Sequence, residues 1–125
     1  MGQWLSVMGG GALGALGRYL MAGAITRLAG PGFPLGTLIV NILGGFAIGA
    51  LVEVMALRWS VAPETRLFLI TGILGGFTTF SAFTLELGGM IERGDIATAG
   101  LYALASVLGS LGAFFAALAL FRSVL

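Results

Sequence analysis

The segment Leu74–Glu86, LGGFTTFSAFTLE, interrupts a longer apolar segment that runs from Leu67 to Met90, and the rest of the chain is organised around it. Gly75, Gly76, Thr78 and Thr79 are weak helix formers gathered within five residues. In lipid, unwound backbone persists only where protein or water satisfies its polar groups. We therefore expect a helix break over Gly75–Thr79, lining a cavity or binding site at membrane depth.

The composition around this segment is that of a membrane protein. Of 125 residues, 58% are hydrophobic and only 9% are charged, whereas soluble domains carry about 25% charged residues. A spanning helix needs roughly 20 apolar residues, and the sequence contains four long uncharged runs, at 1–17, 28–52, 67–85 and 96–121. We expect an all-α membrane protein, a single domain over residues 1–125, with spans at about 3–26, 35–57, 64–91 and 96–121.

Several function classes are excluded by residue types that are missing. The chain has no cysteine and no histidine, which removes thiolate metal sites and the usual proton shuttle. The sequence also lacks a nucleophile–base pair and a phosphate-binding loop. We therefore expect no catalytic residues, and the chain is not predicted to be an enzyme.

The arginines bear on orientation. With four spans, Arg58, Arg66 and Arg122 fall on one side of the membrane, and Arg27 and Arg93 fall on the other, with Arg18 near that second side. Cytoplasmic loops normally carry an excess of positive charge. Because the arginines are divided so evenly between the two sides, the sequence predicts insertion in both orientations.

The first two spans each contain one conspicuous polar side chain. Arg18 can snorkel to the interface or can draw anions toward a vestibule. Asn41 is either a hydrogen-bonded link between helices or an N–H donor facing a pore. Gly10 and Gly14 form a small-xxx-small pattern that allows another helix to approach closely. Glu53, near the end of its span, is expected at the interface.

The last two spans carry polar and aromatic groups in register. The break falls at the middle of the third span, where Phe80 and Phe83 share a face and Glu86 lies one step further along it. In the fourth span Tyr102, Ser106 and Ser110 recur at spacing four. Such hydroxyls either bond back to their own helix or form a hydrated track. Because the edge of a Phe ring is electropositive, the whole set favours an anion.

These motifs resemble those of the small bacterial fluoride channels of the Fluc (CrcB) type. The resemblance is carried by GTLIVNILGGFAIG (Gly36–Gly49), GGFTTFSAFTLE (Gly75–Glu86), the Gly14–Arg18 segment and the stripe from Tyr102 to Ser110. It extends over essentially the whole chain. Family members can place a threonine one turn beyond the second serine, where this chain has Phe114.

The resemblance implies an antiparallel, dual-topology homodimer with two fluoride pores and a sodium ion on the two-fold axis. It assigns the sodium-binding backbone carbonyls to Gly75 and Thr78. Arg18 is expected, from its own position in the first span, to be a vestibule charge. The residues expected along each fluoride pore are Asn41, Thr79, Phe80, Ser81, Phe83, Glu86, Tyr102, Ser106 and Ser110.

The sequence therefore predicts a passive fluoride channel of the bacterial inner membrane that confers fluoride resistance. The main alternative is a small dual-topology drug/proton exporter, which would need a carboxylate deep in a span, usually the first. The first span contains none. A third alternative, a subunit that assembles without transporting anything, would need only the glycine-rich helices.

Overall fold

The computed structural model describes residues 2–125, and all regular secondary structure in that range is helical. It comprises α1 (Gly2–Ala29), α2 (Leu35–Leu57), a composite third helix and α6 (Ile96–Val124). The composite helix is built from α3 (Pro63–Arg66), the π-helical segment η1 (Leu67–Leu74), α4 (Gly75–Phe77) and α5 (Phe80–Glu92). The expected all-helical chain of four helices is confirmed.

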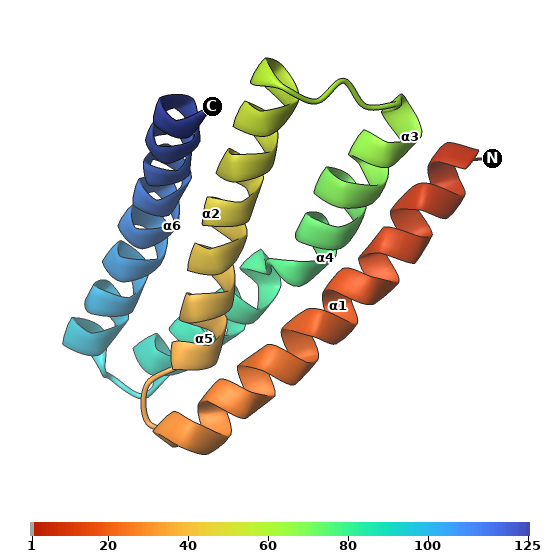
Figure 1. Ribbon diagram of the computed structural model, residues 1–125. Helices are drawn as coiled ribbons and strands as arrows, with labels where there is room; N and C mark the ends of the chain where they lie inside the picture. Colours follow the sequence, from red (N-terminus) through yellow and green to blue (C-terminus); the bar gives the residue numbers. More distant parts are fainter. Residues whose placement is uncertain (1) are drawn as a thin grey trace.

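The four helices alternate in direction. Both termini and the α2–α3 connection lie at one end of the bundle, which we call the terminal end (Figure 1). The α1–α2 and α5–α6 connections lie at the opposite end. α6 packs along α2, and α1 packs along η1 and α4. The arginines are thereby divided between the ends, because Arg58, Arg66 and Arg122 lie toward the terminal end, and Arg27 and Arg93 toward the other.

Three of the helices are long and apolar enough to cross a membrane: α2, the composite helix Pro63–Glu92 and α6, with 23, 30 and 29 residues. The chain is therefore a membrane protein with several spanning helices. α1 has a comparable length of 28 residues, but its glycines make it less apolar than the other three.

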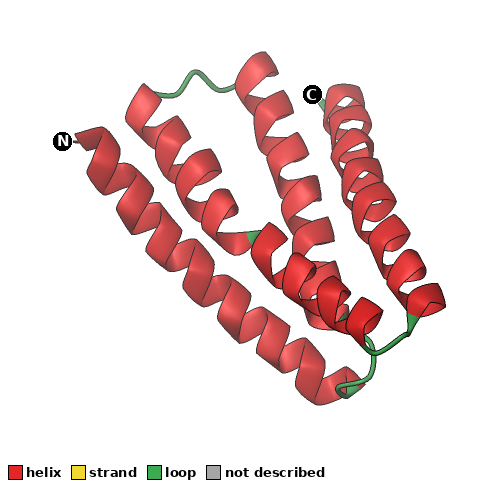
Figure 2. Cartoon of the chain, turned by 180° about the vertical axis from the view of Figure 1, so that it is seen from behind, coloured by secondary structure: helices red, strands yellow, loops and turns green. Residues whose placement is uncertain are grey.

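The break in the composite helix consists of Thr78 and Thr79, whose backbones are extended (Figure 2). The Thr78 hydroxyl donates to Leu74 O at 2.9 Å. The Thr79 hydroxyl accepts from Ala82 N at 3.0 Å, which caps α5. The two threonines thus end one helix and begin the next.

The prediction that Gly75 and Gly76 belong to the break is wrong, because both are helical. Gly76 serves helix packing instead. A Cβ on Gly76 would lie 2.6 Å from Gly11 O, and one on Gly10 would lie 2.9 Å from the Cα of Gly72. The prediction that the Gly10–Gly14 pattern allows another helix to approach closely is confirmed. Glycines on both helices bring α1 against the composite helix.

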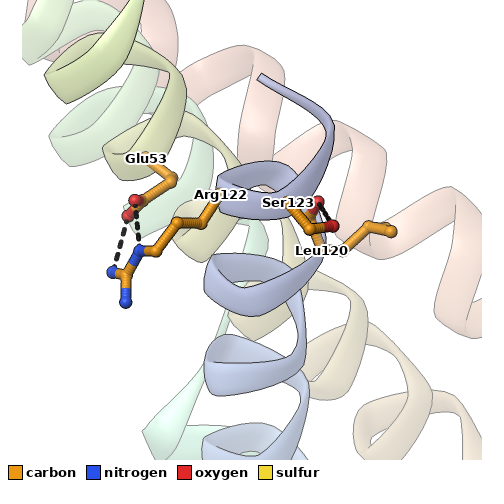
Figure 3. Close-up of polar contacts among 4 residues, drawn as sticks. All are labelled: Glu53, Leu120, Arg122 and Ser123. Atoms are coloured by element: carbon orange, nitrogen blue, oxygen red, sulfur yellow. Dashed lines mark hydrogen bonds and ion pairs between the residues drawn. The ribbon is translucent and has the colours of Figure 1, made fainter.

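An ion pair joins α2 and α6 near the terminal end (Figure 3). Arg122 Nε donates to Glu53 Oε1 at 2.8 Å, and a second guanidinium nitrogen donates to Oε2 at 3.2 Å. Glu53 is only 6% exposed, although it lies near the end of its span as expected. A buried carboxylate needs a partner of opposite charge, and Arg122 on the neighbouring helix supplies it. One residue on, Ser123 Oγ donates to Leu120 O and closes the last turn of α6.

Candidate functional site

A groove of about 410 Å³ opens beside the break, between α2, the composite helix and α6. It brings together the predicted pore residues Asn41, Thr79, Phe80, Phe83, Ser106 and Ser110, and the predicted sodium-site residues Gly75 and Thr78. Ser81, Glu86, Tyr102 and Arg18 do not line it. Among the described residues, those lining the groove carry no charged side chain, so its polar groups are amides, hydroxyls and backbone.

Asn41 fastens α2 to the break. Its Oδ1 accepts from Thr79 N at 2.8 Å, and its Nδ2 donates to Thr79 O at 3.0 Å. The side chain therefore takes the place of a helical neighbour for both backbone groups of Thr79. An amide nitrogen carries two hydrogens, and only one is needed for Thr79 O. Asn41 can thus link the helices and still offer a donor to the groove it lines.

The break releases backbone carbonyls from the helical ladder. In a continuous helix the N–H of Thr79 would donate to Gly75 O, and that of Ala82 to Thr78 O. Here Thr79 N donates to Asn41 and Ala82 N donates to the Thr79 hydroxyl. A third carbonyl at the break, Gly76 O, accepts from Arg18 Nε at 3.1 Å. Arg18 thus lies against the break itself.

Two phenylalanine rings line the groove just beyond the break. The centroids of Phe80 and Phe83 lie 5.6 Å apart, with the rings inclined at 38°. Their surroundings differ, since Phe83 is buried whereas Phe80 is 78% exposed. One ring is thus fixed by the core of the chain, and the other stands open on its surface.

The serines of α6 face these rings across the groove. Ser106 is 7% exposed. Its hydroxyl is the one buried side-chain polar atom among residues 2–125 for which the structure gives no hydrogen-bond partner. Buried polar groups are nearly always paired, so an unpaired one calls for an explanation. Ser110 lies one turn further, where a Cβ on Gly45 would lie 2.7 Å from the Ser110 carbonyl. The groove ends before Phe114, which packs against Gly49.

Glu86 and Tyr102 lie outside the groove, and Tyr102 contacts one of the rings that line it. The Tyr102 hydroxyl donates to Glu86 Oε1 at 3.0 Å, and its ring lies 5.1 Å from that of Phe83. Glu86 lines a second cavity of about 250 Å³, bounded by α5 and the connection 30–34. Ser81 also lies off the groove, with its hydroxyl 3.2 Å from that of Thr79. The contacts Phe83–Tyr102–Glu86 thus connect the groove with the second cavity.

Sequence reasoning missed three features of this site. The pairing of Asn41 with Thr79 spans 38 positions and leaves no local pattern. The cap that Thr79 provides could have been found, because threonine is a preferred N-cap residue. The second cavity depends on the conformation of the 30–34 connection. In the sequence, only the glycines and prolines of this connection indicate that it turns.

The groove is suited to a small anion. Neutral N–H and O–H donors can replace the hydration shell of an ion without trapping it by charge. Among the described residues no cluster of three or more acidic side chains is placed to hold a metal ion. The oxygen atoms at the break belong to the backbone, to the hydroxyls of Thr78 and Thr79 and to the Asn41 amide. Fold and site together define a polytopic helical membrane protein with an uncharged, donor-lined groove at a broken helix.

Comparison with known proteins gives the family. Residues 5–118 match the family described as CrcB-like protein, Camphor Resistance (CrcB). The chain is 53% identical over 115 residues, 92% of each chain, to the fluoride-specific ion channel FluC of Agrobacterium fabrum. It is 49% identical over 122 residues, 98% of each chain, to the FluC protein of Rhizobium leguminosarum bv. trifolii. The chain therefore belongs to the CrcB family, as its motifs predicted.

Proposed function

We propose that the chain is a fluoride-specific channel that lets fluoride leave the cytoplasm passively and so confers fluoride resistance. One observation carries this proposal beyond the family match: the unpaired, buried Ser106 hydroxyl in a groove without charge. This hydroxyl has almost no accessible surface in the single chain, so it binds an ion in the groove only when a neighbouring side chain moves aside, and no protein group competes for it. The relatives from Agrobacterium and Rhizobium are described as fluoride-specific channels, and we extend that activity to this chain, in the bacterial inner membrane.

In this mechanism the groove replaces water around the ion. Asn41 offers its second N–H, Ser106 and Ser110 offer hydroxyls, and the rings of Phe80 and Phe83 offer electropositive edges. Each contact is neutral, so the ion is stabilised but can leave. Fluoride enters cells as neutral HF, ionises and is then trapped as a strongly hydrated anion. A pathway that only dehydrates the anion is enough to release it, and no enzymatic step is involved.

The proposed assembly is an antiparallel, dual-topology homodimer in which α1 is the fourth crossing of each chain. The length of α1 and its packing along η1 support the crossing. Phe80, 78% exposed beside the groove, supports a second copy that covers it. The even division of arginines between the two ends supports insertion both ways. An inverted copy completes the lining of a pore that a single chain leaves open on one side.

The backbone at the break fits the sodium ion that the family resemblance implies. Gly75 O and Thr78 O are the carbonyls whose helical donors are diverted to Asn41 and to the Thr79 hydroxyl. Two such carbonyls from each chain would give four oxygens at the two-fold axis. Hard cations prefer oxygen ligands, and unwound helices in membrane proteins use carbonyls for sodium. The ion would neutralise the mutual repulsion of these carbonyls and hold the two breaks together.

The drug/proton exporter finds no support in the described residues. Its mechanism needs a carboxylate that a cationic substrate can reach in the spanning region. Glu53 is paired with Arg122, and Glu86 accepts from Tyr102 outside the groove. A subunit that only assembles does not account for the unpaired Ser106 hydroxyl.

The decisive test is reconstitution. The purified protein is placed in liposomes loaded with potassium fluoride, with valinomycin to carry potassium and no proton gradient, and a fluoride electrode records efflux. A channel releases fluoride rapidly, and in parallel liposomes loaded with potassium chloride and read with a chloride electrode it leaves chloride inside. An exporter needs the proton gradient, and an assembly subunit matches protein-free liposomes, so either of those results would refute the proposal.

A further inference from the structure

Tyr102 occupies the junction between the groove and the second cavity. It is fully buried. The centroid of the Tyr102 ring lies 5.1 Å from that of Phe83, and the Tyr102 hydroxyl donates to Glu86 Oε1 at 3.0 Å. Any movement of Tyr102 therefore alters a groove ring and a cavity carboxylate together.

Phe33 supports Tyr102 from a third direction. Its ring centroid lies 5.5 Å from that of Tyr102 with an interplanar angle of 84°, an edge-to-face contact. Phe33 belongs to none of the three helices that form the groove, since it comes from the connection between α1 and α2. The four rings of Phe80, Phe83, Tyr102 and Phe33 thus form one continuous series of contacts.

The backbone of the connection fixes where the Phe33 ring lies. Gly30 has a φ of +87°, a conformation that glycine adopts without steric cost. Pro31 and Pro34 restrict the chain on both sides of Phe33. Leu35 N donates to Phe33 O at 2.7 Å, which ties the connection to the start of α2. The position of the Phe33 ring is therefore fixed by a turn with a restricted backbone.

Resting on the proposed fluoride channel, we propose that Phe33 is a positioning residue for anion selectivity, because it holds Tyr102 against Phe83 and Glu86. Without this contact Tyr102 tilts, the edge of Phe83 is no longer fixed, and Glu86 loses its donor. The junction then widens and admits the larger chloride ion. Phe33 lines the second cavity together with Glu86 but does not line the groove, so it acts on the groove through Tyr102.

The chain offers a matched control for this proposal. Phe46 makes the same kind of edge contact, with Phe121 at 6.4 Å, and likewise does not line the groove. Phe33→Leu and Phe46→Leu each remove one aromatic edge contact, whereas Phe33→Tyr retains the ring. An aromatic pair changes a local equilibrium by about three- to tenfold. We expect the fluoride-over-chloride efflux ratio to fall by about that factor in Phe33→Leu only.

A second readout does not depend on transport. The chain has two tyrosines, and with 3-fluorotyrosine incorporated, the exposed Tyr19 serves as reference for the buried Tyr102 in ¹⁹F spectra. Phe33→Leu should shift or broaden the Tyr102 resonance, whereas Phe46→Leu should not. An unchanged resonance in Phe33→Leu, or an equal loss of selectivity in Phe46→Leu, overturns the proposal. If the wild-type protein shows no fluoride efflux, the proposed channel function is refuted. The Tyr102 resonance then still tests, on its own, whether Phe33 positions Tyr102.

Discussion

Replacing Asn41 separates its two roles, the link to the break and the donor to the ion. Asn41→Ala leaves both backbone groups of Thr79 without their protein partners, and because these groups are only partly buried, each costs less than the roughly 1–3 kcal/mol of a fully buried group. Asn41→Asp keeps an acceptor for Thr79 N, but it places a negative charge in the groove. Against an anion at about 4 Å, with an effective dielectric constant near 20, that charge costs about 4 kcal/mol.

The two variants should therefore rank in opposite orders. Thermal unfolding in detergent should show Asn41→Ala as the less stable protein. Fluoride efflux from liposomes should fall roughly 10- to 100-fold in Asn41→Ala, for one lost donor to an anion. It should fall by about 10³ in Asn41→Asp, from the electrostatic cost. If Asn41→Asp conducts as well as Asn41→Ala or better, Asn41 is a structural link and does not lie on the path of the ion.

Three further outcomes are expected from single substitutions. Phe83→Ile should slow fluoride efflux at least about tenfold without loss of folding, because an aliphatic group keeps bulk but lacks the polarised edge; an unchanged rate would reduce this ring to packing. Gly76→Leu should prevent α1 from packing on the composite helix, because even a Cβ at Gly76 would lie 2.6 Å from Gly11 O. Gel filtration and circular dichroism should show misfolding of this variant. The control Gly88→Leu, at a position with open space around it, should fold normally. Glu53→Leu should lower the melting temperature more than Glu64→Leu, since only Glu53 is buried against Arg122; equal melting temperatures would show that the ion pair does not stabilise the bundle.

Local sequence was enough for the four helices and for the existence of the break. Long uncharged runs identify the helices because charges are costly in lipid. Threonines in mid-span indicate the break because they are weak helix formers and good caps. The same reasoning assigned Gly75 and Gly76 to the break, because a weak helix former and a residue selected for close packing look alike in one sequence. The role of Gly76 depends on Gly11 of another helix.

The site was predictable as a set of residues but not as an arrangement. The i,i+3 rule correctly placed Phe80 and Phe83 on one face. It also placed Glu86 on the same stripe, yet the Tyr102 hydroxyl binds that carboxylate beside a different cavity. Glu53 was expected at the interface because it lies near a helix end, and its burial depends on Arg122, 69 positions away. Such long-range pairs are decided by packing.

We propose that fluoride passes Ser106, and because the chain has no cysteine, a single introduced thiol can test this directly. Ser106→Cys introduces a single thiol into the groove, and Ser123→Cys introduces one at the end of α6, outside it. Silver ions stay soluble in fluoride and bind thiolates. In chloride-free liposomes, silver should stop fluoride efflux through the Ser106→Cys protein, reversibly with dithiothreitol, and should leave the wild-type protein and Ser123→Cys unaffected. Continued efflux through Ser106→Cys with its thiol shown to be silver-bound would contradict the account.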